Sequence, residues 1–203
     1  MKKICILLAL WLLLCCGCSA RTPEPVQPSP TQPEPAPVPQ AEQAFTPGTV
    51  EDDRYENTFL GYGCQLEGWH FYDDDQLAAL NASADSTMLV DMGAESDDGM
   101  QTLSVQFQKL SEPAEEAALL ESIVPTMPDA LLAAGYENLK IEQETVSLGG
   151  EEHACLSIIG SIQGVAVHQL QVVVSCGEYM AYLSATGYLS DSPYDILRLF
   201  YKL

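Results

Sequence analysis

The chain has 203 residues, and its 29 Asp and Glu residues against 8 Lys and Arg residues give a formal net charge of -21. So acidic a chain is repelled by nucleic acid and by anionic lipid or wall polymers, so we expect it to bind none of them directly. Its charge is compatible with attraction to divalent cations or to a basic partner, and also with a simple role in solubility.

The first segment has the pattern of a lipoprotein signal. Two lysines precede an apolar run from Ile4 to Leu14, which is too short to cross a bilayer and is typical of a signal-peptide core. The letters CCGCSA that follow resemble a bacterial lipobox, in which a small residue, here Gly17, precedes the cysteine that receives a diacylglycerol. We expect residues 1–17 to be a lipoprotein signal peptide and Cys18 to become the lipidated N-terminus. This predicts a protein anchored to the cell membrane on its extracytoplasmic face.

Two other interpretations of these cysteines remain open. Cys15 and Cys18 have the C-x-x-C spacing of a redox or metal pair, although a leader peptide does not supply the folded setting that lowers a thiol pKa. Cys16 is a second candidate for acylation, but the cysteine before it fits the small-residue position less well than Gly17 does.

Residues 18–47 form the next segment, which runs from the lipidated cysteine through a stretch rich in Pro, Glu, Gln and Ser. Frequent proline disfavours helices and sheets and favours extended polyproline II. We therefore expect a Pro-rich disordered linker that holds the following domain away from the membrane. The alternative is that PEPAPVP is a ligand for a proline-recognition module.

Residues 48–203 have the length of one globular domain with its own core. An extended segment opens it and ends in a turn at LEGW. Asp73 or Asp74 fits the N-cap of a short helix. Two strands of a hairpin are expected at 87–92 and 102–109, because the Asp-Gly pair between them suits the turn.

The longest helical region is expected to run from Ser111, as its N-cap, to Gly135, as its C-cap. Pro125 and Pro128 interrupt it and predict two helical pieces or one kinked helix. A meander of four strands follows, because Gly-containing turns separate runs that are rich in apolar residues. The expected strands are Tyr136–Leu148, Glu152–Gly160, Val165–Ser175 and Glu178–Thr186.

The third of these strands has apolar residues on both faces. One face carries Leu170, Val172, Val174 and Cys176, and the other carries Gln169, Gln171, Val173 and Ser175. Because of its valine, we expect the second face to be partly covered. A helix capped at Ser190 or Ser192 then closes the chain, with Ile196, Leu197 and Phe200 facing inward. These elements predict an α+β domain, an antiparallel sheet of about six or seven strands with helices packed on it.

The chain resembles the PsbP-like fold in two respects. One is the order of its elements, and the other is the set of segments YEN, GYGCQLEGW, VSLGGEEHACLSIIG and SPYDILRLFYKL. More closely, the layout is similar to small lipoproteins of anaerobic Gram-positive bacteria. The resemblance covers nearly the whole domain and implies an α/β/α sandwich with a non-catalytic assembly or stabilising role. The LEGW segment departs from the pattern, because PsbP-like members usually carry a proline before Gly-Trp. The resemblance assigns no functional residues.

The histidines offer little metal chemistry. None of them has the i, i+4 spacing of a metalloprotease motif. His153 and His168 fall on neighbouring expected strands, but the expected turn places His168 opposite about Leu156, which separates the two by about 10 Å. A metal pair there would need a change of strand register, and we expect no metal and no cofactor.

Cys64, Cys155 and Cys176 remain after processing of the signal peptide. We expect buried free thiols, and the alternative is a Cys155–Cys176 disulfide, although strand alternation places these two on different faces. Acidic clusters at 73–75 and 95–98 do not fit the calcium-loop template. Helix capping and turn formation account for them as an alternative to weak divalent-cation binding.

Aromatic residues gather near the first turn of the domain. Tyr62, Trp69, Phe71 and Tyr72 are candidates to line a ligand groove, and the alternative is that they fill one end of the core. No catalytic signature is present. We therefore expect a non-catalytic binding or accessory module whose partner is an unknown envelope protein or small ligand. The alternatives are a hydrolytic or redox envelope enzyme that uses His153, His168 or Cys155, and a purely structural envelope role.

Overall fold

The computed structural model describes residues 44–84 and 87–203. The predicted signal peptide, the predicted lipidation site at Cys18 and most of the predicted linker lie outside these residues. No helix in the described ranges is long and apolar enough to cross a membrane.

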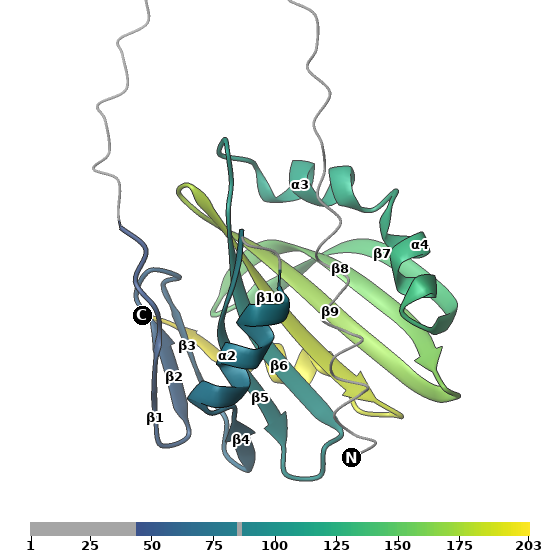
Figure 1. Ribbon diagram of the computed structural model, residues 1–203, viewed down its shortest axis with the longest axis horizontal. Coiled ribbons are helices and arrows are strands. Elements are labelled where there is room, and N and C mark those ends of the chain that lie inside the picture. Colours follow the sequence, from purple (N-terminus) through teal and green to yellow (C-terminus); the bar gives the residue numbers. More distant parts are fainter. Residues whose placement is uncertain (1–43, 85–86) are drawn as a thin grey trace, which may run out of the picture.

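The domain contains two antiparallel sheets (Figure 1). The smaller sheet has the strand order β1-β2-β3-β11, and the larger has the order β4-β5-β6-β10-β9-β8-β7. The small-sheet strands are β1 (Thr49–Glu51), β2 (Arg54–Asn57), β3 (Tyr62–Gln65) and β11 (Phe200–Lys202). The large-sheet strands are β4 (Trp69–Phe71), β5 (Met88–Ser96), β6 (Gln101–Lys109), β7 (Tyr136–Leu148), β8 (Glu151–Ile162), β9 (Val165–Cys176) and β10 (Tyr179–Tyr188). The α+β class is confirmed, and the second sheet is an addition to the prediction.

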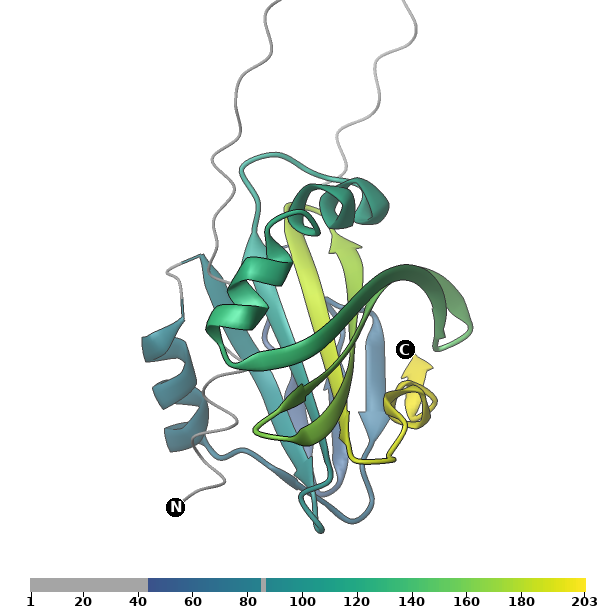
Figure 2. The same ribbon diagram turned by 90° about the vertical axis from the view of Figure 1, so that its right-hand side faces the viewer.

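The large sheet is covered differently on its two faces (Figures 1 and 2). One face carries the helices α2 (Asp74–Ser83), α3 (Glu116–Ile123) and α4 (Met127–Ala133). The other face carries the small sheet and the short helix α5 (Pro193–Leu197). The helix-bearing face is called face B below, and the face toward the small sheet is called face A.

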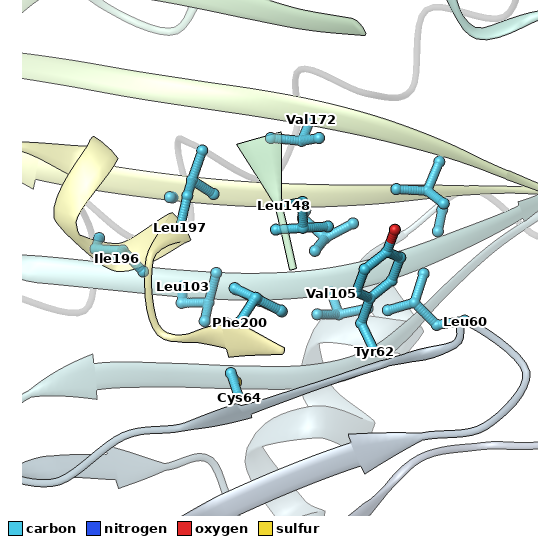
Figure 3. Close-up of a cluster of buried hydrophobic side chains, with 14 of the residues drawn as sticks. Leu60, Tyr62, Cys64, Leu103, Val105, Leu148, Val172, Ile196, Leu197 and Phe200 are labelled. Carbon is cyan, nitrogen blue, oxygen red and sulfur yellow. The ribbon is translucent and has the colours of Figure 1, made fainter. Parts of the chain in front are cut away.

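The main core lies between the two sheets on face A (Figure 3). Alternate residues of β6, β9 and β10 point into it, among them Leu103, Val172 and Leu183, all of which are buried. Tyr62 and Phe200 enter it from the small sheet, and α5 adds two buried residues. A second core lies on face B between α3, α4 and the strands β7 to β10. Both faces of β9 are therefore covered, as its sequence predicts.

Several elements match the expectations closely. Asp73 is the N-cap of α2, and its carboxylate and the Gln76 side chain form a reciprocal capping box. The 111–135 region contains two helices, and Gly135 ends it with φ 90°. The four strands of the meander lie where they were predicted, with end points that shift by at most two residues.

Three expectations about single elements are wrong. The α3 helix begins at Glu116 rather than after Ser111, because Pro113 disfavours helical geometry in the residue before it. The closing helix ends at Leu197, and Phe200 instead begins a strand that pairs with β3. Cys155 and Cys176 both face the main core rather than opposite faces of the sheet.

Candidate functional site

Polar side chains form a strip across the middle of face B. Strands β6, β10 and β9 lie side by side there, and in antiparallel register Ser184 pairs with both Ser104 and Gln171. Two residues further along, Thr186 pairs with both Thr102 and Gln169. The polar strip is defined as the buried residues Thr102, Ser104, Gln106, Gln169, Gln171, Ser184 and Thr186. Along the flanking strands, α2 packs on β5, whereas α3 and α4 pack on β7, β8 and β9.

Three oxygen atoms of the strip have no hydrogen-bond partner among the residues that the structure describes. They are Oε1 of Gln171, Oγ of Ser184 and Oγ1 of Thr186, whose residues are 3%, 7% and 1% exposed. A buried polar atom without a partner costs about 1–3 kcal/mol, so native proteins rarely retain one without a reason. Here three of them lie on the adjacent strands β9 and β10 and on the same face, which makes this region a candidate binding site.

Two hydrogen bonds involve other side chains of the strip. Gln106 Nε2 donates to Ser104 Oγ at 3.3 Å, and the Tyr136 hydroxyl donates to Gln169 Oε1 at 3.3 Å. Among the described residues, the buried side-chain atoms without a partner all lie on β9 and β10.

Tyrosines border the strip. Tyr136 and Tyr182 are buried, and the Tyr182 hydroxyl donates to Gln108 Oε1 at 2.8 Å. Tyr72 lies against Gly93, which pairs with Ser104 of the strip, and a Cβ at this glycine would clash with the tyrosine ring. Burial raises the pKa of Tyr72 to about 12, so its hydroxyl remains neutral at physiological pH.

The four aromatic residues singled out in the sequence do not form one site. Tyr62 projects from β3 of the small sheet into the main core (Figure 3). Its ring lies edge-on to His153, and its hydroxyl donates to Glu151. Trp69 and Phe71 pack at the edge of the same core. Only Tyr72 lies on face B, at the border of the polar strip.

His153 belongs to a polar network at the other end of the sheet. Its Nδ1 lies 3.0 Å from Glu116 Oε1, and its Nε2 lies 2.9 Å from the Tyr62 hydroxyl. The Glu116 carboxylate also accepts backbone N–H groups from Ala154 and Ser175. This network joins α3, the large sheet and the small sheet. Both ring nitrogens of His153 are engaged within it, so the imidazole is held as a structural link.

The Tyr62 hydroxyl in this network is a poor nucleophile. Burial, followed by the hydrogen bond to Glu151, raises the pKa of Tyr62 well above its usual value. The arrangement resembles a carboxylate–histidine–hydroxyl triad in outline, but the phenolate that would attack a substrate is strongly disfavoured.

His168 lies next to a serine. Ser157 Oγ is 3.0 Å from His168 Nε2, and the imidazole ring packs edge-on against Tyr194 of α5. The nearest carboxylate, that of Glu144, accepts the hydrogen bond of the Tyr194 hydroxyl. Ser157 is buried and lies within a β8 strand that pairs on both sides, so its backbone N–H is not free to stabilise an oxyanion. The pair therefore lacks the surroundings that a hydrolase needs.

The strand register separates the two histidines more than expected. The turn between β8 and β9 contains only Gln163 and Gly164, both with positive φ, and it pairs Ile162 with Val165. His168 therefore lies opposite Ile159, which is six residues, or about 20 Å, from His153 along the strand. A His153–His168 metal pair is excluded by this register. The described residues contain no group of three or more potential metal ligands.

The three cysteines of the domain are free thiols. Cys64 and Cys155 are fully buried, and Cys176 is half-buried. Cys155 pairs with Val172, four residues before Cys176 on β9, so the two thiols are too far apart to form a disulfide. Burial raises the pKa of Cys155 to about 12, which disfavours the thiolate that redox or nucleophilic chemistry requires.

The comparisons with known proteins add little to this site. No family model matches the chain, and no curated protein matches it significantly. Among solved structures, the chain is similar to a crystal structure from Bacteroides thetaiotaomicron VPI-5482, with 8% sequence identity and a TM-score of 0.47. The match covers 76% of this chain and 49% of the other, so the chain spans about half the length of that protein. A likeness of this size carries no argument about function.

Proposed function

We propose that the protein is a membrane-anchored extracytoplasmic lipoprotein that acts as a non-catalytic binding module and holds a small ligand on the polar strip. The observation that carries this proposal is the set of three buried, unpartnered oxygens on Gln171, Ser184 and Thr186. A ligand that forms hydrogen bonds to all three would offset a desolvation cost that the free protein bears.

The proposed role is binding rather than catalysis because the reactive side chains are held in structural roles. His153 is engaged at both ring nitrogens, and the Cys155 thiol is buried with a raised pKa. The strip itself contains only hydroxyl and amide side chains, which orient a ligand but transfer protons poorly at neutral pH.

The proposed anchor is the lipid on Cys18. It rests on the CCGCSA segment after a short apolar run, which is typical of lipoprotein signals. Mass spectrometry of the mature chain from the membrane fraction should find an N-terminal Cys18 that carries a diacylglycerol. An intact leader, or an unmodified chain in the medium, would contradict the proposed anchor.

We also propose that the domain is a variant of the PsbP-like sandwich, in which the small sheet and α5 replace one helical layer. The order of the elements along the chain supports this assignment. An experimental structure whose strand order and connections differ from those of PsbP-like domains would contradict it.

Native mass spectrometry tests the binding role. The full lipoprotein is purified in mild detergent from its own membrane, and the expected result is an added mass from a non-covalent ligand. A Gln171→Leu/Thr186→Val variant should lose this mass, whereas Thr145→Val, which alters an exposed threonine of β7, should retain it. An added mass that persists in the double variant would place the ligand elsewhere and overturn the proposed site.

A further inference from the structure

We propose that the ligand of the polar strip is a neutral carbohydrate of one or two sugar units. This inference rests on the proposed function, because it names the ligand class of that same site. Its basis is the combination of hydrogen-bonding groups, charge, aromatic rings and dimensions that the strip presents.

The hydrogen-bonding groups require a ligand that both donates and accepts. Gln171 Oε1 can only accept, so the ligand must present a donor to it. The hydroxyls of Ser184 and Thr186 can each donate and accept. A ligand with neighbouring hydroxyl groups meets all three demands, because every hydroxyl is at once a donor and an acceptor.

The charges around the strip favour a neutral ligand. All five basic residues of the described ranges form ion pairs with carboxylates, and none of the five belongs to the strip. An acidic residue, Glu95, pairs with Thr102 at one end of the strip. Its carboxylate repels anionic ligands such as phosphates and uronic acids, and no basic side chain compensates for that repulsion.

Aromatic rings border the hydrogen-bonding groups. Tyr72 lies against Gly93 at one end of the Ser104–Ser184–Gln171 row. Tyr182 lies on the same face of β10 as Ser184, two residues before it, and pairs with Gln106 of the strip. A sugar ring has C–H groups on its faces and hydroxyls at its edge. Tyrosine combines an apolar ring with a polar end, which suits contact with both kinds of group.

The dimensions of the strip also fit. Adjacent strands are about 4.8 Å apart, so a row across β6, β10 and β9 spans about 10 Å, and the two rows are about 7 Å apart. This area is comparable to that of a monosaccharide or disaccharide. Glu95, Gln108 and Tyr188 at the ends of the strip are half-buried, so the strip is less deeply buried there than in its middle.

A methyl-NMR titration of the full lipoprotein in detergent tests this inference. The threonine methyl groups are labelled, and cellobiose, maltose and chitobiose are added in turn, with galacturonic acid and trialanine as anionic and peptide probes. We expect at least one neutral disaccharide to shift the Thr186 methyl signal in a saturable manner below about 10 mM, without an effect of galacturonic acid. The Gln171→Leu variant should weaken this binding at least about tenfold, and Thr145→Val should not change it.

The outcomes separate this inference from the proposed function. A saturable shift of Thr186 with trialanine but with no sugar would overturn the carbohydrate and leave a binding site for neutral amides. Binding of galacturonic acid in preference to the neutral sugars would also overturn it. A strip whose oxygens prove to be saturated by ordered buried waters, seen in a high-resolution crystal structure, would overturn both the carbohydrate and the proposed site.

Discussion

The substitution Thr186→Val should make the free protein more stable while it weakens ligand binding. Thr186 is 1% exposed, and its Oγ1 has no partner among the described residues. Valine has nearly the same shape and an equally good β-strand propensity, so the change removes a buried hydroxyl without opening a cavity. An unsatisfied buried polar group costs about 1–3 kcal/mol, and we expect a gain of about 1–2 kcal/mol in the free energy of unfolding.

Urea denaturation followed by circular dichroism measures this gain. With an m-value of about 2 kcal/mol/M, the gain shifts the unfolding midpoint upward by about 0.5–1 M without a change in m. The control is Tyr136→Phe, because the Tyr136 hydroxyl donates a hydrogen bond to Gln169 Oε1, and Gln169 pairs with Thr186 across the strands. That variant should lose about 0.5–1.5 kcal/mol, since it removes a hydrogen bond that exists.

The opposite result for Thr186 would refute the reasoning. A loss of stability in Thr186→Val as large as that in Tyr136→Phe would mean that the Thr186 hydroxyl has a partner, such as a buried water, in the free protein. The strip would then be a hydrated part of the core rather than a ligand site.

The remaining predictions concern the rest of the fold. Asp91→Ala should lower the free energy of unfolding by about 2–5 kcal/mol, as measured by urea denaturation. The reason is that the Asp91 carboxylate accepts the hydrogen bond of the buried Tyr55 hydroxyl at 2.6 Å and so connects the small sheet to β5. A loss below about 1 kcal/mol would contradict this. Burial lowers the pKa of His168, so the unfolded chain takes up a proton first as the pH falls below about 6.5. The free energy of unfolding should therefore decline from that pH toward the lower pKa of the folded protein. His168→Gln should flatten this decline, and equal slopes of stability against pH in the two proteins would contradict the prediction. Gly93→Ala should displace the ring of Tyr72 and lower stability by about 1–3 kcal/mol in thermal denaturation, and an unchanged melting temperature would show that the ring is not held there.

The meander could be predicted from the sequence because its strands are long and its turns are short. Runs of ten residues or more with apolar residues on alternate positions leave little freedom in where a strand lies. The register was harder to predict. Treating GSIQG as the turn placed His168 opposite about Leu156, whereas positive φ at Gln163 and Gly164 closes a two-residue turn and moves the pairing by three residues.

The small sheet was missed for a physical reason. Its strands have only three or four residues, which is too short for an alternation of apolar and polar residues to be recognised in the sequence. Its stability instead depends on contacts that are distant in the chain. Asp91 of β5 accepts hydrogen bonds from Gly48, Tyr55 and Asn57, and β11 at the C-terminus pairs with β3. No local pattern reports such contacts.

The polar strip was only half visible in the sequence. Gln169 and Gln171 were recognised as one face of β9, but hydroxyl and amide residues at alternate positions of β6 and β10 look like an ordinary solvent-exposed face. What distinguishes them is that β6, β10 and β9 are neighbours in the middle of a seven-stranded sheet. That order depends on the pairing of β6 with β10 across about eighty residues of chain, which alternation alone does not specify.

The position of the strip within the sheet explains why it suits binding. Strands β6, β10 and β9 each pair on both sides, and their opposite face is packed against the small sheet, so their backbones are fixed before a ligand arrives. On face A the same strands carry valine, leucine and alanine, which shows that this chain fills sheet positions with apolar residues where only packing matters. On face B it has hydroxyls without a partner among the described residues, at positions where we expect valine to fit and to be more stable. A preorganised binding site requires a rigid sheet surface with free hydrogen-bonding groups, even at some cost in stability. Ligand binding then loses little free energy to the ordering of the site.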